Sequence, residues 1–201
     1  MKSSKKLKIL AAGDLHGDPA LAKKLAEKAR KENVDLVILA GDITGFIETK
    51  NIIKPFKDLN QKILLLHGNW EDAATADFLA QMYHAKNLNS YSVKYGDIGI
   101  FGAGGAVGFN TTEREIFNAL KKGNKYLQDV NKKVMVTHMH PLGSKSEFSG
   151  FKGSKAIRKA ILEFKPDILI HSHIHEAEGI EGKIGKTKVI NVGRRGKIIE
   201  I

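Results

Sequence analysis

The chain has 201 residues and a formal net charge of +11, and it contains no cysteine. The lack of cysteine excludes disulfides and thiolate metal sites and favours a reducing compartment, so we expect a cytoplasmic protein. No apolar run approaches the roughly 20 residues that a membrane-spanning helix needs, so we expect no membrane partner. The lysines that carry the charge are spread along the sequence, which allows nucleic acid as a partner but does not favour it.

The first half of the chain alternates apolar runs with helical patterns. Asp18 is a typical N-cap residue, and Pro19 suits the first position of the helix that follows it. A later, shorter helix is disturbed by Pro55. The strands predicted here are 7–12, 34–40 and 62–66, and the later helices are 48–59 and 72–82. This alternation predicts parallel βαβ units.

The second half begins with a predicted hairpin, in which strands 91–95 and 98–101 turn at Gly96 and Asp97. Further strands are predicted over 133–137, 167–170, 188–192 and 197–201. The last two of these strands are expected to pair as a second hairpin through residues 193–196.

Two helices are predicted between the strands of the second half. Thr112 and Glu115 have the spacing of a capping box for a helix from about 113, which Gly123 is expected to weaken or end. Ser154 caps the next helix, and Pro166 stops it. We find no linker and no internal repeat, so residues 1–201 are expected to form one domain.

Polar side chains follow five of the apolar strands, at the point where each strand ends. They are Asp14, His16, Asp42, Asn69, His138, His171, His173 and His175. Because the carboxyl ends of parallel strands lie at one edge of a sheet, we expect these side chains to gather there. Asp14 with His16, and His173 with His175, are spaced two residues apart, which places both members of each pair on one face of an extended chain.

This set of side chains offers oxygen and nitrogen ligands and no sulfur. Such ligands suit Mn, Fe, Zn, Co or Ni better than calcium, which prefers oxygen alone. Two Asp, one Asn and at least four of the His give seven or more ligands, which are too many for a single tetrahedral zinc and favour two ions that share a carboxylate. The sequence therefore predicts a dinuclear metal site.

The same residues carry a resemblance to the calcineurin-like metallophosphoesterases. That family has AspXaaHis, GlyAsp, GlyAsnHis with an acidic residue next, a lone His, and GlyHisXaaHis. The corresponding residues here are Asp14-Leu15-His16, Gly41-Asp42, Gly68-Asn69-Trp70-Glu71, His138 and Ser172-His173-Ile174-His175. Residues 102–113 and 153–166 also look like the small archaeal-type members. The resemblance implies an α/β fold, a four-layer αββα sandwich of two mixed β-sheets flanked by helices.

The resemblance also implies roles for the ligands. The first ion would be held by Asp14, His16, Asp42 and His175. The second would be held by Asp42, Asn69, His138 and His173, with Asp42 bridging. The implied activity is hydrolysis of a phosphodiester or phosphomonoester, in which a metal-bridging hydroxide attacks phosphorus in line with the leaving oxygen. We expect manganese first, with Fe, Zn, Ni or Co as alternatives.

Trp70 stands where the family normally has a histidine that assists the leaving group. Indole has no proton that titrates near neutral pH, so Trp70 cannot act as a general acid. Either another group such as His67 or His140 takes this role, or the substrate has a good leaving group on which Trp70 stacks. The third alternative is a catalytically weak metal-binding scaffold.

We assign catalytic roles to four residues, which are His16, Asp42, Asn69 and His140. Trp70 and Arg194 are predicted to contact a small phosphate-ester substrate, since a guanidinium can bind phosphate through two parallel hydrogen bonds. A nuclease is a further option that the positive charge mildly favours.

Overall fold

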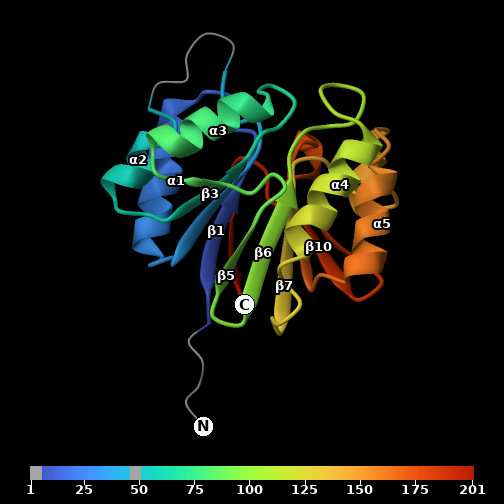
Figure 1. Ribbon diagram of the computed structural model, residues 1–201. Helices are drawn as coiled ribbons and strands as arrows, with labels where there is room; N and C mark the ends of the chain where they lie inside the picture. Colours follow the sequence, from blue (N-terminus) through green and yellow to red (C-terminus); the bar gives the residue numbers. More distant parts are fainter. Residues whose placement is uncertain (1–5, 46–50) are drawn as a thin grey trace.

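Two β-sheets lie face to face in the computed structural model of this protein, and helices cover the outer face of each sheet (Figure 1). The structure describes residues 6–45 and 51–201. The arrangement is a four-layer αββα sandwich, so the predicted fold class is confirmed.

The first sheet has five strands in the order β11-β1-β2-β3-β4. They are β1 (Lys8–Ala12), β2 (Leu36–Ala40), β3 (Ile63–Leu66), β4 (Lys86–Asn87) and β11 (Lys197–Glu200). Strands β1 to β4 are parallel, and β11 pairs with β1 in the antiparallel direction. The connecting helices are α1 (Pro19–Lys31), α2 (Lys54–Asp58) and α3 (Ala73–Met82).

The second sheet has six strands in the order β5-β6-β7-β8-β10-β9. They are β5 (Ser92–Tyr95), β6 (Ile98–Ala103), β7 (Lys132–Thr137), β8 (Ile168–His171), β9 (Glu181–Ile184) and β10 (Thr187–Asn191). The two edge strands, β5 and β9, are antiparallel to their neighbours, and the four central strands are parallel. Its helices are α4 (Glu113–Asn124) and α5 (Lys155–Phe164), with short 3₁₀ turns η1 (Lys145–Ser149) and η2 (His175–Ala177).

Successive strand residues face different layers of the sandwich. In β1, Ile9 faces the other sheet whereas Leu10 packs against the outer helices. In β7, Val134 faces the first sheet and Met135 packs against the helices of the second. Because both faces of these strands are buried, the sequence shows continuous apolar runs instead of alternation.

The predicted helix starts are confirmed by their caps. The Asp18 carboxylate accepts a hydrogen bond from the Leu21 amide at the start of α1. At the start of α4, Thr112 and Glu115 form both hydrogen bonds of the capping box. The Ser154 hydroxyl caps α5. These caps satisfy backbone donors that a helix leaves unpaired in its first turn.

Two predicted elements differ from the structure. The helix expected over 48–59 is only Lys54–Asp58 among the described residues, because Pro55 is favoured in the first turn and starts the helix late. Residues 48–50 of that prediction lie outside the described residues. The expected hairpin of the last two strands is wrong, since β10 and β11 belong to different sheets and β11 pairs with β1. The partner that β10 takes in a hairpin is β9.

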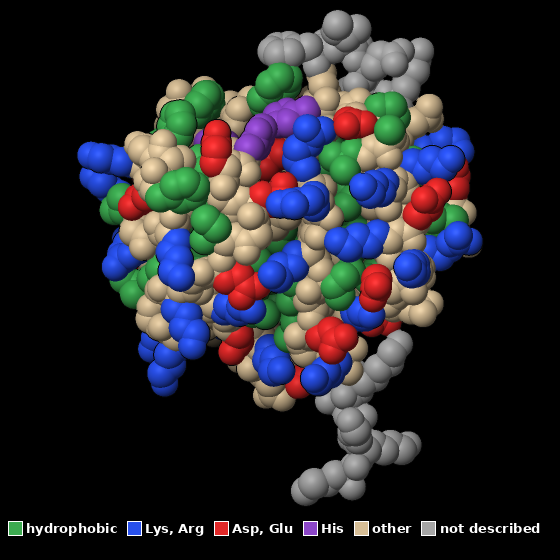
Figure 2. All heavy atoms as spheres, turned by 180° about the vertical axis from the view of Figure 1, so that it is seen from behind, with side chains coloured by type: hydrophobic (Ala, Val, Ile, Leu, Met, Phe, Trp, Pro, Cys, Tyr) green, Lys and Arg blue, Asp and Glu red, His purple; other side chains and the backbone are tan. Residues whose placement is uncertain are grey.

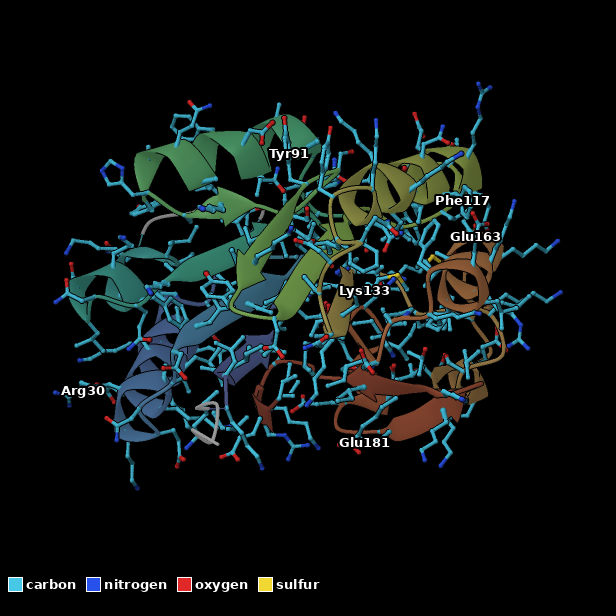
Figure 3. All side chains as sticks on the ribbon, turned by 60° about the horizontal axis from the view of Figure 1, so that its bottom comes forward. Arg30, Tyr91, Phe117, Lys133, Glu163 and Glu181 are labelled. Carbon is cyan, nitrogen blue, oxygen red and sulfur yellow. The ribbon has the colours of Figure 1, made fainter. Side chains whose placement is uncertain are left out.

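Charged side chains lie mostly at the periphery of the molecule. Figure 3 shows Arg30 on α1 and Glu181 on β9 at the outer edges, whereas Lys133 lies nearer the middle. The Lys133 ammonium donates hydrogen bonds to the Phe164 carbonyl and the Asn124 side chain, near the ends of α5 and α4. A cation at these carboxyl ends complements the helix dipoles.

Among the described residues, we find no helix with the length and apolar character that a membrane crossing demands.

Candidate metal centre

The carboxyl ends of β1, β2, β3, β7 and β8 meet at one edge of the sandwich, which we call the carboxyl edge. Figure 2 shows histidine side chains gathered at the upper part of the face seen from behind. The seven predicted ligands, each shortly after one of these strands, are Asp14, His16, Asp42, Asn69, His138, His173 and His175. The parallel topology therefore brings together residues that are up to 161 positions apart, from Asp14 to His175.

Asp14, His16 and His175 form a first group, in which candidate ligand atoms lie within 4.8 Å of one another. The Nε2 atoms of His16 and His175 are 3.2 Å apart. Asp14 Oδ1 lies 3.9 Å from His175 Nε2. Asp14 is buried whereas the His175 side chain is 51% exposed, so the first group opens to solvent at His175.

Asp42, His138 and His173 form a second group within the same distance limit. His138 Nε2 lies 3.2 Å from His173 Nδ1 and 3.0 Å from the side-chain oxygen of Asn69. On the other side of the ring, His138 Nδ1 is 2.9 Å from the Ala40 carbonyl. A hydrogen bond to that carbonyl places the proton on Nδ1 and leaves Nε2 free to bind an ion.

The Asp42 carboxylate lies between the two groups. Its Oδ2 atom is 3.9 Å from His16 Nε2 and 3.4 Å from His138 Nε2. Its Oδ1 atom accepts hydrogen bonds from the backbone amides of Asn69 and Trp70. One oxygen is thus fixed by the backbone, and the other faces both groups, which is the arrangement a bridging carboxylate requires.

Four of the seven candidate ligands have a left-handed backbone conformation. Their φ angles are 55° for Asp14, 48° for His16, 50° for Asp42 and 71° for His173. Such a conformation typically costs about 1–3 kcal/mol at a residue other than glycine, and it clusters at functional sites. At these four residues the strain lies in the turns that carry the candidate ligands.

Glu71 holds together the turns that follow β2 and β3. Its buried carboxylate accepts hydrogen bonds from the amides of Ile43, Thr44 and Gly68 and from the Thr44 hydroxyl. Because Asp42 and Asn69 lie in these two turns, Glu71 fixes the separation of two ligands without facing the centre itself.

The surroundings of Asp14 and Asp42 shift the pKa values of these two carboxyl groups in opposite directions. Burial raises the pKa of Asp14 to about 6, against the opposing charges of His138 and His175. Burial would also raise the pKa of Asp42, but the hydrogen bond and charge of His138 outweigh it and hold that pKa at about 2. Asp42 is therefore a carboxylate at neutral pH, ready to bind a cation.

The histidines of the second group are also shifted in opposite directions. Burial disfavours a charged His138, but its hydrogen bond to Asp42 and the charges of Asp42 and Asp14 raise its pKa to about 9. Burial lowers the pKa of His173 to about 3. Without metal, a proton on His138 supplies the positive charge that the carboxylates demand, and a divalent cation would supply it in the loaded protein. The donor set thus fits two divalent transition-metal ions.

The family model of the calcineurin-like phosphoesterases matches residues 7–177, a range that contains all seven candidate ligands. The chain belongs to this family. The family therefore accounts for the order of the ligands along the chain and for the sandwich that brings them together.

Solved structures of similar fold span almost the whole of this phosphoesterase chain. The protein TT1561 of Thermus thermophilus is 16% identical, with a TM-score of 0.76 and coverage of 98% of this chain and 99% of that chain. An archaeal phosphodiesterase is 19% identical, with a TM-score of 0.54 and coverage of 96% and 98%. A dimetal phosphatase from Danio rerio is 12% identical, with a TM-score of 0.57 and coverage of 92% and 86%. At these identities the likeness shows the fold alone. No curated protein gives a significant match.

Trp70, Arg194 and His140 were also predicted to serve the site, and each lies in a different environment. Trp70 lies beside the first group, with its ring centroid 4.5 Å from that of His16. The Arg194 guanidinium is paired with Asp18 at 3.1 Å. Its positive charge is also among the influences that lower the pKa of His16, after burial and the opposing charge of Asp42.

His140, the predicted proton donor, is buried behind His173. The two rings are stacked with centroids 6.4 Å apart, and His140 Nε2 lies 3.1 Å from the Phe151 carbonyl. Its Nδ1 atom is buried without a hydrogen-bond partner. This position packs His140 against the candidate ligand His173, and its catalytic role stays a prediction.

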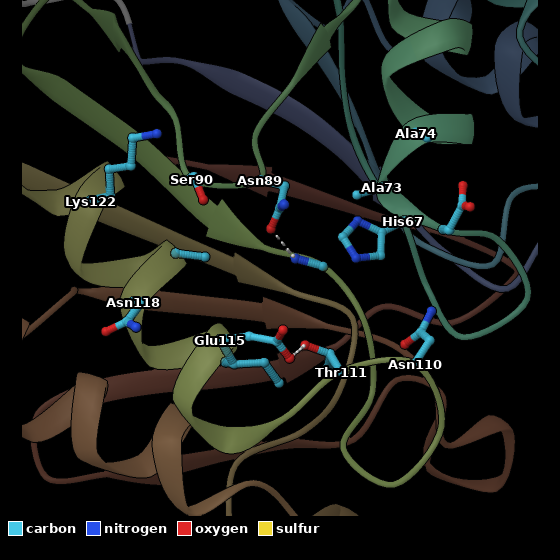
Figure 4. Close-up of a pocket in the computed structure, with 14 residues that line it drawn as sticks. His67, Ala73, Ala74, Asn89, Ser90, Asn110, Thr111, Glu115, Asn118 and Lys122 are labelled. Atoms are coloured by element: carbon cyan, nitrogen blue, oxygen red, sulfur yellow. Dashed lines mark hydrogen bonds between the residues drawn. The ribbon is translucent and has the colours of Figure 1, made fainter.

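His67, the other candidate proton donor, lines a cavity of about 590 Å³ that contains none of the seven candidate ligands (Figure 4). Asn89, Asn110, Glu115 and Lys122 are among the other residues of this cavity. Burial lowers the pKa of His67 to about 4, so its ring is neutral at pH 7. The cavity of His67 is thus distinct from the two ligand groups, although the charge of His138 also contributes to lowering the pKa of His67.

Sequence reasoning missed Phe109 and Asn110, which lie near the centre. The Phe109 ring contacts His173 edge-on, with centroids 5.9 Å apart. The Asn110 amide donates hydrogen bonds to the carbonyls of Gly68 and Glu71. The segment 102–113 resembled small archaeal-type relatives as a whole, but no periodicity or spacing singled out these two residues.

Proposed function

We propose that this protein is a dinuclear metal-dependent phosphoric ester hydrolase that acts on small phosphodiesters or phosphomonoesters. The observation that carries the proposal is the position of Asp42 Oδ2, which faces His16 of the first group and His138 of the second. One carboxylate oxygen between two clusters of metal ligands is what a pair of ions sharing a bridge requires.

The residues that would hold the ions follow from the two groups. Asp14, His16, Asp42 and His175 would hold one ion, and Asp42, Asn69, His138 and His173 would hold the other. When bound, the two ions supply a nucleophilic water and Lewis-acid stabilisation of the phosphoryl oxygens. Manganese is our first candidate, followed by iron, zinc, nickel or cobalt.

The chain's own side chains set limits on the leaving group. Trp70 offers one N–H donor and no titratable proton near neutral pH, and neither His67 nor His140 belongs to the two groups of candidate ligands. A general acid typically contributes about 10²–10⁴-fold to a rate. The geometry thus favours phosphodiesters whose leaving groups depart without protonation. We keep Arg194 as a proposed phosphate contact, which requires that its guanidinium exchange its Asp18 partner for the phosphate; its charge acts on His16.

The test is hydrolysis of bis-p-nitrophenyl phosphate with Mn²⁺ by the wild-type protein and by Asp42→Asn. We expect metal-dependent activity that falls about 100-fold or more in Asp42→Asn, because the amide removes the negative charge between the two groups. Asp58→Asn, which changes an exposed carboxylate paired with Lys54, is the matched control and should keep full activity.

The replacement of the family histidine by Trp70 favours one alternative, a metal-binding scaffold with little turnover. Elemental analysis of the same preparations distinguishes it from the hydrolase. Two bound ions per chain together with no hydrolysis above the Asp42→Asn variant would support the scaffold. The absence of any bound transition metal after soaking would contradict both.

A further inference from the structure

Two exposed aromatic side chains flank the metal centre, one beside each group of ligands. Trp70 lies edge-on to His16 and is 43% exposed. Phe109 lies edge-on to His173, with planes 79° apart, and is 65% exposed. Each ring therefore contacts a ligand histidine and leaves part of its surface exposed to solvent.

Trp70 and Phe109 come from separate segments that are firmly joined. Asn110 donates through its side-chain amide to the Gly68 carbonyl at 2.7 Å and to the Glu71 carbonyl at 3.1 Å. The Gly105 amide donates to the His67 carbonyl at 3.0 Å. These bonds hold the backbone segment of Phe109 against the backbone segment of Trp70.

The contacts of Asn110 use the whole of its side chain. While its amide nitrogen bonds to the segment that carries Trp70, its oxygen accepts a hydrogen bond from Ala106 in its own segment. Asn110 is thus a positioning residue that orders the backbone next to Phe109. Phe109 is thus an exposed ring on an ordered backbone next to a candidate metal ligand.

We propose that Trp70 and Phe109 form the two walls of a subsite that binds a planar aromatic group of the phosphoester. This inference deepens the proposed function and rests on it. Flat rings bind between aromatic side chains through stacking and edge contacts, and every nucleobase or aryl group has such a face. The substrate class is therefore a phosphoester that carries an aryl or nucleobase group, with its phosphate at the metal centre.

Binding of phosphonates tests the subsite without requiring turnover. Phenylphosphonate and methylphosphonate carry the same anion and differ in the aromatic ring, and their carbon–phosphorus bonds resist hydrolysis. We expect the Mn²⁺-loaded protein to bind phenylphosphonate about 10-fold more tightly than methylphosphonate in calorimetry. Trp70 is the only tryptophan of the chain, so its fluorescence should change with phenylphosphonate and stay nearly constant with methylphosphonate.

Variants assign this preference to the two rings. Trp70→Ala and Phe109→Ala should each reduce the preference for phenylphosphonate over methylphosphonate to about 3-fold or less. The readout is the ratio of the two affinities, so a change at the metal centre that weakens both phosphonates equally does not alter it. Phe109→Tyr should retain the preference, and Phe109→Leu should lose most of it. Phe78→Ala is the matched control, because Phe78 is a similarly exposed ring on α3, and its preference should equal that of the wild type.

The outcomes separate this inference from the function on which it rests. Equal binding of both phosphonates by the wild type, in a metal-dependent manner, overturns the aromatic subsite and leaves the phosphoesterase proposal standing. No metal-dependent binding of either phosphonate overturns both. A nucleoside 5′-phosphonate that binds more tightly than phenylphosphonate identifies a nucleobase as the ring, and equal or weaker binding identifies a simple aryl group.

Discussion

Trp70 occupies the position at which the GlyAsnHis motif of the family has its histidine, and its indole lies edge-on to His16. The exchange removes a group that can protonate a leaving oxygen and adds a large apolar surface. In the function that we propose, this single residue shifts the site from acid assistance toward recognition of an aromatic group. The side-chain oxygen of Asn69, the residue just before it, lies 3.0 Å from His138 Nε2.

Trp70→His should raise turnover of phosphodiesters with alkyl leaving groups by about 10-fold, because a poor leaving group gains most from a proton donor. Turnover of p-nitrophenyl esters should stay level or fall, since this leaving group needs no proton and loses its stacking partner. Steady-state kinetics on a p-nitrophenyl and an alkyl diester checks this, with bound metal measured in both proteins. Equal changes on the two substrates would contradict the assignment.

The strands position the candidate ligands through the turns that follow their carboxyl ends, and Glu71 joins the turns after β2 and β3. Glu71→Gln puts an amide donor against the amides of Ile43, Thr44 and Gly68, so buried donors lose their acceptor. We expect a loss of about 2 kcal/mol in the free energy of unfolding and a Tm lower by about 4–8 °C. Mn²⁺ affinity should fall about 10-fold.

Thermal unfolding with EDTA and calorimetry with Mn²⁺ measure the two effects of Glu71→Gln. Glu27→Gln is the control, because it removes the same charge from an exposed position on α1. An unchanged metal affinity in Glu71→Gln, at a lowered Tm, would show that Glu71 serves stability alone.

The strand ends, and so the candidate ligands, were predictable from the sequence because buried strands are apolar at nearly every position. In Ile63–Leu66 the apolar run stops just before the polar residues of the site. The same reasoning missed β9, whose residues Glu181–Ile184 include a lysine and Gly182 and so have no apolar signature. It also mispaired β11, because the pattern of a strand does not specify which sheet edge receives it.

The contacts of Phe109 and Asn110 lay outside the reach of sequence reasoning for a related reason. These residues follow β6 in a loop without helical or strand periodicity, and the carbonyls that Asn110 binds belong to Gly68 and Glu71, which are distant in sequence. Only the packing of the two sheets brings these segments together.

For the whole molecule, the buried histidines and carboxylates link stability to pH and to metal. Burial lowers the pKa values of His67, His171 and His173 to about 4, 3 and 3. The unfolded chain therefore binds more protons than the folded chain below about pH 6.5, and stability falls as the pH drops. Asp14, with its pKa raised to about 6, opposes this in part, since the folded state then binds the extra proton.

His138 has the opposite effect at higher pH. Its pKa of about 9 in the folded state exceeds that of an ordinary histidine, so its contribution to stability is complete below about pH 6.5 and is lost as the pH rises through about 9. Taken together, these groups predict that the metal-free protein is most stable near pH 6.5. Each unopposed group changes the free energy of unfolding by up to about 1.4 kcal/mol per pH unit.

Bound metal should raise stability most at high pH, because an ion can bind His138 Nε2 only after the proton on that atom has left. We expect Mn²⁺ to stabilise the protein increasingly from pH 6.5 to 8.5 and so to abolish the decline on the alkaline side. Urea unfolding at several pH values, with EDTA and with Mn²⁺ in excess, measures both profiles. His67→Gln should reduce the slope of the free energy of unfolding against pH, on the acidic side, by the contribution of about one proton. The effect of Mn²⁺ should remain, since His67 lines a cavity that contains none of the candidate ligands. A stabilisation by Mn²⁺ that is independent of pH would show that the ion does not compete with a proton at His138, and the assignment of the second group would fail.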